Sequence, residues 1–183
     1  MMTGNTRPPS QDPLRPEFWN KRFRDGVTPW DAGRVPLQVR DYIDRHRPRG
    51  RILIPGCGAA HEARAFADAG GDVLAIDFSP QAVAEAIAGS GLSGEQVRVA
   101  DFFAGNLNGE PSDLVYERAF LCALPPSRHQ HYAKRMAELI PPGGRLIGYF
   151  YFDDHPGGPP FGVSAEQLQR LLSRYFRNLI DAA

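Results

Sequence analysis

The stretch RILIPGCGAAH, residues 51–61, decides the fold, because an apolar run breaks into glycines and continues directly into alanines. Residues 52–54 predict a short buried strand, and the pattern after the glycines predicts a helix over 59–69. Gly56 and Gly58 lie at the junction, where backbone N–H groups of the helix N-terminus would face a ligand at the end of the strand. The stretch therefore predicts a loop that binds a nucleotide-type cofactor.

The rest of the chain repeats this alternation of short apolar strands and helices. Further strands are expected at 73–76, 97–99, 114–116 and 146–152, and further helices at 80–88 and 128–140. Because parallel strands need right-handed helical crossovers, the order predicts an α/β fold with a doubly wound, mostly parallel, Rossmann-like sheet and helices on both faces. Ligands of such sheets bind at the carboxyl ends of the strands.

Helix start signals accompany three of the helical segments. Ser79 followed by Pro80 predicts an N-cap and a first helical residue. Ser127 with Gln130 three residues later predicts a capping box for the helix over 128–140. Ser164 is expected to cap a further helix near the end of the chain.

We expect one folded domain with an N-terminal addition. Residues 1–15 are polar and proline-rich and are expected to form a disordered leader. Residues 16–50 are expected to form a helical lid, with helices that open near Pro16 and Pro36, and residues 51–183 the Rossmann-like domain.

The composition favours a small-molecule partner. Lys and Arg together number 21, as do Asp and Glu, so the charge gives no reason to expect nucleic acid or an anionic membrane as a partner. The two cysteines, Cys57 and Cys122, lack the paired spacing of a zinc site, and no metal is expected. The N-terminal stretch lacks the apolar core of a secretion signal and no segment reaches membrane-spanning length, so we expect a cytoplasmic protein.

Acidic residues at two strand ends narrow the choice of cofactor. Asp77 ends the second strand, 21 residues after Gly56, where a carboxylate can hold a ribose diol in NAD binders and S-adenosylmethionine binders alike. Asp101 ends the third strand and is followed by Phe102 and Phe103. An acid that can accept from an adenine amino group, beside aromatic faces, is the arrangement expected for S-adenosylmethionine. Together the acids favour methyl transfer over hydride transfer.

The glycine loop and Asp77 also fit other interpretations. A P-loop is excluded because no Gly-Lys-Ser/Thr follows the glycines. An NAD(P)-dependent oxidoreductase is favoured by the glycines and Asp77 but opposed by Asp101 and by His61, which stands where the dinucleotide motif has its third glycine. A purely structural interpretation would make Asp77 a helix cap and Phe103 a core residue.

A set of motifs carries a resemblance to a known family. The segments FWNKRF, TPWDAG, IPGCGAAHEA, AIDFSPQAV, ADFF, DLVYERAFLCALPP and PPGGRLIGYFYFDDHPGGPPF together resemble the thiopurine S-methyltransferase superfamily, which includes bacterial homologues and plant halide and thiol methyltransferases. The resemblance runs from about Phe18 to the end of the chain. It implies a seven-stranded fold dependent on S-adenosylmethionine and methylation of a small soft nucleophile such as a thiol, selenol or halide.

The resemblance also implies which residues bind the cofactor. The glycine loop would contact it, Asp77 would hold the ribose, Asp101 and Phe102 would lie near the adenine, and Arg118 would contact it after the fourth strand. The full set of cofactor-binding residues expected is Trp19, Phe23, Trp30, Gly56, Cys57, Gly58, Asp77, Phe78, Asp101, Phe102, Phe103 and Arg118. The family's tryptophan in the N-terminal helix falls on Phe23, so an aromatic face is kept and an indole N–H donor is lost. TPWDAG is more similar to the halide and thiol branch than to the thiopurine branch, and would place Trp30 and Asp31 in a lid over the cofactor.

The end of the chain departs from the family pattern. FRNLIDAA, residues 176–183, resembles the beginning of the sixth strand, and the family continues into a seventh, antiparallel one. A domain lacking that strand is therefore expected, either as a monomer or as an oligomer in which another chain completes the edge. An inactive protein that still binds the cofactor is a further alternative.

Arg118 is the candidate catalytic residue. Transfer from a sulfonium is an in-line displacement, for which positioning can contribute about 7–11 kcal/mol. A thiol acceptor must react as thiolate, and with a free pKa of about 8.5 it needs only modest help from a cation such as Arg118. The structural alternative for Arg118 is an ion pair with Glu117 or Asp113. His129 and His131 are acid–base alternatives, although both are expected to face solvent at a helix start.

The aromatic segment 149–152 and the turn-rich DDHPGGPPFG after it are expected to form the acceptor wall. The residues expected to contact the methyl acceptor are Asp31, Tyr151, Asp153, Asp154 and His155, with the last three as its polar rim. The alternative is that this segment is only a connector.

Overall fold

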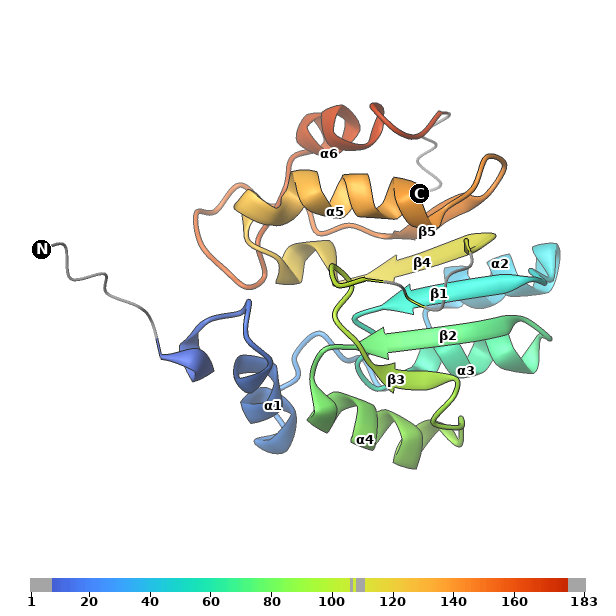
Figure 1. The fold of residues 1–183 in the computed structure, drawn as a ribbon, viewed down its shortest axis with the longest axis horizontal. Coiled ribbons are helices and arrows are strands. Elements are labelled where there is room, and N and C mark those ends of the chain that lie inside the picture. Colours follow the sequence, from blue (N-terminus) through green and yellow to red (C-terminus); the bar gives the residue numbers. More distant parts are fainter. Residues whose placement is uncertain (1–7, 106, 108–110, 178–183) are drawn as a thin grey trace, which may run out of the picture.

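A computed structural model describes residues 8–105, 107 and 111–177, and they form a parallel sheet between two layers of helices (Figure 1). The strands are β1 (Arg51–Pro55), β2 (Asp72–Asp77), β3 (Val97–Val99), β4 (Leu114–Arg118) and β5 (Arg145–Tyr149). Their order is β3-β2-β1-β4-β5, with every neighbouring pair parallel. This arrangement confirms the doubly wound α/β fold.

Helices cover both faces of the sheet, because successive side chains of each strand point to opposite faces. The helices are α1 (Pro16–Arg24), α2 (Leu37–His46), α3 (His61–Asp68), α4 (Pro80–Ser90), α5 (Pro126–Leu139) and α6 (Ala165–Leu172). Ile52 and Ile54 of β1 pack with α2, α3 and α4, whereas Leu53 packs with α5 and α6 on the other face. The single residue step along β1 thus separates the two apolar cores.

The N-terminal helix α1 lies beyond the carboxyl ends of the strands, next to α4 (Figure 1). The side-chain carbonyl of Asn20 accepts hydrogen bonds from the Ser79 hydroxyl at 2.6 Å and from the backbone N–H of Gln81 at 3.2 Å. These bonds satisfy donors at the N-terminus of α4 that a helix cannot satisfy internally. Asn20 therefore anchors α1 beside the end of β2.

Two of the three expected helix starts are confirmed. Ser79 accepts from the Ala82 N–H at 3.1 Å with Pro80 as first helical residue, and Ser164 forms a capping box with Gln167. The box predicted at Ser127 is wrong. Here α5 begins at Pro126, because proline suits the first helical position and thus moves the start ahead of the serine.

The fifth strand is shorter than predicted. β5 ends at Tyr149, which pairs with Arg118, the last residue of β4. Beyond that point no β4 residue is left to pair with, and the chain leaves the sheet, with one bridge between Phe152 and Val163. The sixth strand expected over 176–183 falls largely on residues 178–183, outside the described part of the chain. None of the helices in the described ranges combines the length and apolarity that crossing a bilayer would require.

Candidate functional site

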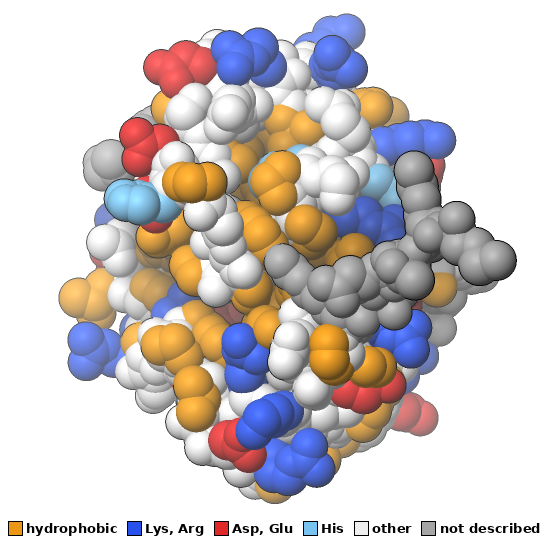
Figure 2. All heavy atoms as spheres, turned by 90° about the vertical axis from the view of Figure 1, so that its left-hand side faces the viewer, with side chains coloured by type: hydrophobic (Ala, Val, Ile, Leu, Met, Phe, Trp, Pro, Cys, Tyr) orange, Lys and Arg blue, Asp and Glu red, His pale blue; other side chains and the backbone are white. Residues whose placement is uncertain are grey.

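A cavity of about 810 Å³ opens where the strands end. Figure 2 looks onto this side of the molecule, and apolar side chains gather around the centre of the face. The cavity is lined by the glycine loop, the ends of β2, β3 and β4, the lid and the segment after β5. All the residues expected to bind the cofactor line it: Trp19, Phe23, Trp30, Gly56, Cys57, Gly58, Asp77, Phe78, Asp101, Phe102, Phe103 and Arg118. A pocket of this size is typical of a small-molecule site.

The glycine loop has a backbone shape that side chains would obstruct. Gly56 and Gly58 have φ values of +61° and +49°, a region that residues with a Cβ rarely adopt. A Cβ on Gly56 would lie 2.6 Å from the ring of Phe120. Ala60 is also left-handed, with φ of +58°, so α3 begins at His61, two residues later than predicted. The loop leaves space for a ligand next to exposed backbone, as a nucleotide-type cofactor requires.

Asp77 joins the glycine loop to the start of α4. Its Oδ2 accepts from the Gly58 N–H at 3.1 Å and its Oδ1 accepts from the Ser79 N–H at 2.9 Å. Burial raises the pKa of Asp77, and the hydrogen bonds from Ser79, Gly58 and Phe78 oppose that rise. Each carboxylate oxygen keeps a lone pair. Asp77 can therefore order the loop and accept a ribose hydroxyl at once.

The residues after β3 form an aromatic side of the cavity. Phe102 is buried and packs edge-on against Phe120, with ring centroids 5.1 Å apart. Phe103 is half-buried, with the guanidinium of Arg128 5.5 Å from its ring centroid and the His131 ring at 4.7 Å. Asp101 accepts from the Phe103 N–H at 2.8 Å through Oδ1. Sequence reasoning missed Arg128, whose position on a capped helix start gave no sign that it would reach the cavity.

His129 does not face solvent as predicted. Its side chain is buried and its Nε2 lies 3.0 Å from the carbonyl oxygen of Leu124. Burial lowers the pKa of His129. The contact ties α5 to the chain just before it, at Leu124.

The lid presents a cluster of aromatic rings to the cavity. Trp30 packs edge-on against Trp19 and Phe23, with centroid distances of 5.6 and 5.9 Å. The indole N–H of Trp19 donates to the Pro13 carbonyl at 2.9 Å. A Cβ on Gly58 would lie 3.8 Å from the Phe23 ring, so Phe23 lies over the glycine loop.

A latch of two contacts, His61–Asp31 and Arg118–Trp30, holds the lid to the domain. His61 Nε2 lies 3.1 Å from Asp31 Oδ1, and an Arg118 N–H donates to the Trp30 carbonyl at 3.4 Å. Asp31 Oδ1 also accepts from the Gly33 N–H at 2.7 Å. Asp31 lines the cavity as expected, but its side chain is engaged with His61. That histidine, which opposed the dinucleotide motif, is a structural part of the site.

Arg118 pairs with neither Glu117 nor Asp113. Its guanidinium donates to Glu62 Oε1, in the first turn of α3, which also accepts from the Tyr116 hydroxyl at 3.4 Å. Burial would lower the pKa of Arg118, but the hydrogen bond and charge of Glu62 more than offset that effect and the pKa is raised. The guanidinium thus stays charged at the cavity wall. Sequence reasoning missed Glu62, because its partner lies 56 residues away.

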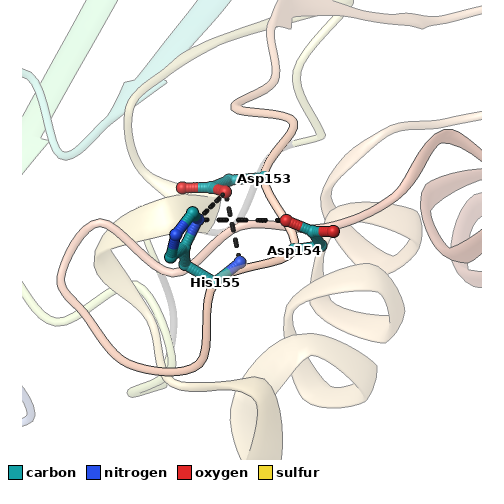
Figure 3. Close-up of side chains that lie close together, drawn as sticks. All are labelled: Asp153, Asp154 and His155. Atoms are coloured by element: carbon teal, nitrogen blue, oxygen red, sulfur yellow. Dashed lines mark hydrogen bonds and ion pairs between the residues drawn. The ribbon is translucent and has the colours of Figure 1, made fainter.

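The expected polar rim lies outside the cavity lining. Figure 3 shows Asp153, Asp154 and His155 on the turn after β5. Asp153 Oδ1 pairs with His155 Nδ1 at 2.9 Å, and its Oδ2 accepts from the Tyr151 hydroxyl at 2.8 Å. These hydrogen bonds, from His155 first and then Tyr151, lower the pKa of Asp153. The ligand atoms of the three rim residues lie within 4.8 Å of one another, but their mutual contacts account for the arrangement without a cation. Of the segment's expected contacts, Tyr151 lines the cavity.

Comparisons with known proteins agree with this geometry. Residues 14–180 match the profile of the thiopurine S-methyltransferase (TPMT) family. The chain is 37% identical over 160 residues to thiocyanate methyltransferase 1 of Brassica oleracea, covering 84% of this chain and 70% of that protein. It is 27% identical over 190 residues to thiopurine S-methyltransferase of Pseudomonas fluorescens, covering 90% and 84% of the two chains. The fold is similar to that of 1,6-didemethyltoxoflavin-N1-methyltransferase of Burkholderia thailandensis, solved with bound S-adenosylhomocysteine, with a TM-score of 0.68 at 20% identity over 95% and 81% of the two chains.

Proposed function

The chain belongs to the thiopurine S-methyltransferase family and is an S-adenosylmethionine-dependent methyltransferase, and we propose that its acceptor is a small soft nucleophile. The acceptor class comprises a thiol first, then a halide, thiocyanate or a thiopurine. The alternative of an NAD(P)-dependent oxidoreductase is wrong, because the matched family is one of methyltransferases.

The cavity suits the cofactor on two counts that come from the chain itself. The backbone of the glycine loop lines the cavity at Gly56 and Gly58, where a ligand can approach it, and Phe120 packs against Gly56 on the side where a Cβ would lie. The acids after β2 and β3, Asp77 and Asp101, both line the cavity. We propose that Asp77 accepts from the ribose hydroxyls and that Asp101 and the phenylalanines after it hold the adenine. When bound, the cofactor supplies an activated methyl group on a sulfonium.

The proposed acceptor class is inferred from the hydrogen bonds that the carboxylates of the cavity accept. The four acids that line it are Asp31, Glu62, Asp77 and Asp101, and each already accepts a hydrogen bond from the protein. A general base must be free to take a proton from the acceptor. Asp31 and Glu62 are held by protein partners, and Asp77 and Asp101 are proposed to hold the cofactor. An acceptor that is already an anion at neutral pH or, like a thiol, loses its proton readily is therefore favoured.

The aromatic wall supports the same class for an electrostatic reason. Tyr149, Phe150 and Tyr151 line the cavity together with Pro159 and Pro160. Attack of an anion on a sulfonium removes charge, so surroundings that exclude water favour the reaction. Soft anions are desolvated into such surroundings at lower cost than hard ones.

Arg118 is proposed to guide the anionic acceptor or the cofactor carboxylate. Its guanidinium is held by Glu62 and by the Trp30 carbonyl, at the junction of lid, glycine loop and β4. A planar guanidinium with five donors in a fixed fork can keep both contacts and still offer an N–H to the cavity. Its role is therefore that of a fixed cation that positions the reactants.

The experiment is a screen for transfer of a labelled methyl group from S-adenosylmethionine. Matched acceptors that differ in one atom, such as 2-mercaptoethanol and ethylene glycol, are assayed beside iodide, thiocyanate, selenite and a thiopurine. We expect transfer to at least one sulfur, selenium or halide acceptor and none to the oxygen counterpart. Transfer confined to oxygen or nitrogen acceptors would contradict the proposal.

A further inference from the structure

Glu117 is a buried carboxyl near the end of β4, between Tyr116 and Arg118, which both line the large cavity. Its side chain is 1% exposed. Its Oε1 accepts from the backbone N–H groups of Phe120 at 2.8 Å and Leu121 at 3.1 Å, and its Oε2 lies 3.5 Å from the Tyr132 hydroxyl. These donors are uncharged. Burying an ionised carboxylate costs free energy unless partners stabilise it. Within the described part of the chain, the partners of Glu117 are two backbone N–H groups and a hydroxyl, not a cation.

The backbone that Glu117 holds is the turn formed by residues 118–124. This turn includes Ala119 in a left-handed conformation, with φ of +58°, and the short helix η2 (Leu121–Ala123). A non-glycine residue in that conformation needs the surrounding structure to stabilise it. The two hydrogen bonds to Glu117 fix the backbone directly after Ala119, at Phe120 and Leu121.

The turn contacts both the part of the cavity proposed for the cofactor and the segment after β5 proposed for the acceptor. The ring of Phe120 lies against Gly56 of the cofactor loop and packs edge-on against Phe102 at 5.1 Å. The carbonyl of Cys122 accepts from the Phe161 N–H at 2.7 Å, which ties the segment after β5 to the turn. A shift of this turn would therefore move the glycine loop, the aromatic side and the acceptor wall together.

We propose that Glu117 is a positioning residue for methyl transfer. Its carboxyl fixes the turn that contacts both the cofactor loop and the segment proposed to bind the acceptor. Only the part of this inference that concerns the methyl acceptor rests on the proposed function. The effect of Glu117 on cofactor binding follows from contacts with the glycine loop and can be measured without any acceptor.

The environment of Glu117 makes this role sensitive to pH. Burial raises the pKa of Glu117 to about 7, against the opposing hydrogen bonds from Leu121, Phe120 and Tyr132. The titratable groups nearest to it are Tyr132 of α5 and Cys122 of η2, and Tyr151 lines the same narrow crevice. The hydroxyl of Tyr149, which also lines the crevice, is directed to Gln38 instead. The pKa of each of these is raised, that of Cys122 to about 12, so they stay neutral around pH 7. A change of charge here therefore belongs to Glu117.

The test measures the affinity for S-adenosylhomocysteine by calorimetry between about pH 5.5 and 8.5, a range that spans the titration of Glu117. The variants are Glu117→Gln, which keeps an acceptor oxygen, and Glu117→Ala, which removes it. Glu85→Gln on the exposed face of α4 is the matched control. Wild type and control should gain affinity several-fold as pH rises through about 7, because the ionised carboxylate is the stronger acceptor. Glu117→Gln should lose this inflection, and Glu117→Ala should bind about tenfold more weakly or worse.

Two outcomes would overturn the inference. One is a Glu117→Gln profile that keeps the wild-type inflection, and the other is a folded Glu117→Ala variant that binds with wild-type affinity. If Glu117→Ala does not fold, the Glu117→Gln profile still decides. A wild type that binds S-adenosylhomocysteine but methylates no soft nucleophile would defeat the proposed acceptor class and leave this binding test intact.

Discussion

At the end of β2, the carboxylate of Asp77 bridges two backbone segments before any ligand binds. It holds the Gly58 N–H on one oxygen and the Ser79 N–H on the other. Both interpretations made from the sequence, a helix cap and a ribose acceptor, are thus compatible with its geometry. Its role at the ribose stays a prediction, which a conservative substitution can test.

Replacing Asp77 by Asn should weaken the binding of S-adenosylhomocysteine at least tenfold. An amide at this position offers one acceptor oxygen in place of two, so either the loop or the ribose loses a hydrogen bond to a charged group, worth about 1.5–3 kcal/mol. Calorimetry measures the loss. Asp72→Asn at the exposed start of β2 is the control, and equal affinities for the two variants would argue against a ribose contact.

Glu117 should make the stability of the protein depend on pH. Its pKa rises from an ordinary 4.5 to about 7 on folding, so the folded protein holds this proton more tightly than the unfolded chain. The stabilisation from this group is full below about pH 4.5 and is lost as pH rises through 7, by roughly 3 kcal/mol.

Thermal denaturation of wild type and Glu117→Gln between about pH 5 and 8 tests this linkage. The melting temperature of wild type should fall more than that of the variant, by about 5–10 °C over the range. The buried His129, whose pKa is lowered, acts in the opposite direction, but it is common to both proteins and cancels in the difference. Parallel curves would rule out a buried titration at Glu117.

Among the elements of the lid, α2 packs in the core, whereas the segment between α1 and α2 that carries Trp30 and Asp31 has few polar contacts with the domain. α1 is anchored through Asn20, whereas the segment after it is held by His61 and Arg118. A segment with few anchors opens more readily than the sheet beneath it. The segment with Trp30 and Asp31 is therefore the part of the lid expected to move when the cofactor enters or leaves.

Replacing His61 by Ala should speed the release of S-adenosylhomocysteine several-fold. The substitution removes the contact to Asp31 and one side chain of the cavity lining, but leaves Arg118 and its contacts in place. The two tryptophans of the chain, Trp19 and Trp30, both line the cavity, so tryptophan fluorescence reports on the lid. Stopped-flow fluorescence gives the release rate, with His46→Ala on the exposed side of α2 as control. An unchanged rate would mean that the latch does not limit release.

For the whole molecule, the cavity joins parts that are distant in sequence. Residues of the N-terminal lid, of the ends of β1, β2 and β4 and of the segment after β5 all contribute to its lining. A ligand that fills this cavity binds the folded state alone and must stabilise it. Measuring this stabilisation therefore tests which cofactor binds, without any methyl acceptor.

S-adenosylhomocysteine at about 100 times its dissociation constant should stabilise the protein by about 2.7 kcal/mol. For a chain of this size that corresponds to a rise in melting temperature of about 5–11 °C. Differential scanning fluorimetry measures it, with NADH at equal concentration as control. A shift with NADH and none with S-adenosylhomocysteine would contradict the assignment of the cavity.

Much of the fold followed from local patterns. Apolar runs predicted the five described strands, and serines before helices predicted two of three starts. The error at Ser127 came from weighing the serine above the proline beside it. The overlong fifth strand came from reading the aromatic run 149–152 without its partner, since β5 ends with β4.

The sequence predicted where the candidate site lies better than it predicted which residues contact one another there. The acids at strand ends were placed correctly because parallel strands must end at one edge of a sheet. The rim residues Asp153 to His155 were misplaced, since nothing local shows which way a turn outside the sheet will point.

The sequence by itself determined the doubly wound fold, the glycine loop, the strand-end acids and the family, because each depends on neighbours within one element or on a motif. Only the tertiary structure decided that Arg118 pairs with Glu62, that His61 holds Asp31 and that Glu117 is buried beneath the turn. These pairs join residues 56 and 30 positions apart, or depend on how α5 covers β4. Such partners are chosen by the docking of whole elements, which no pattern within one of them contains.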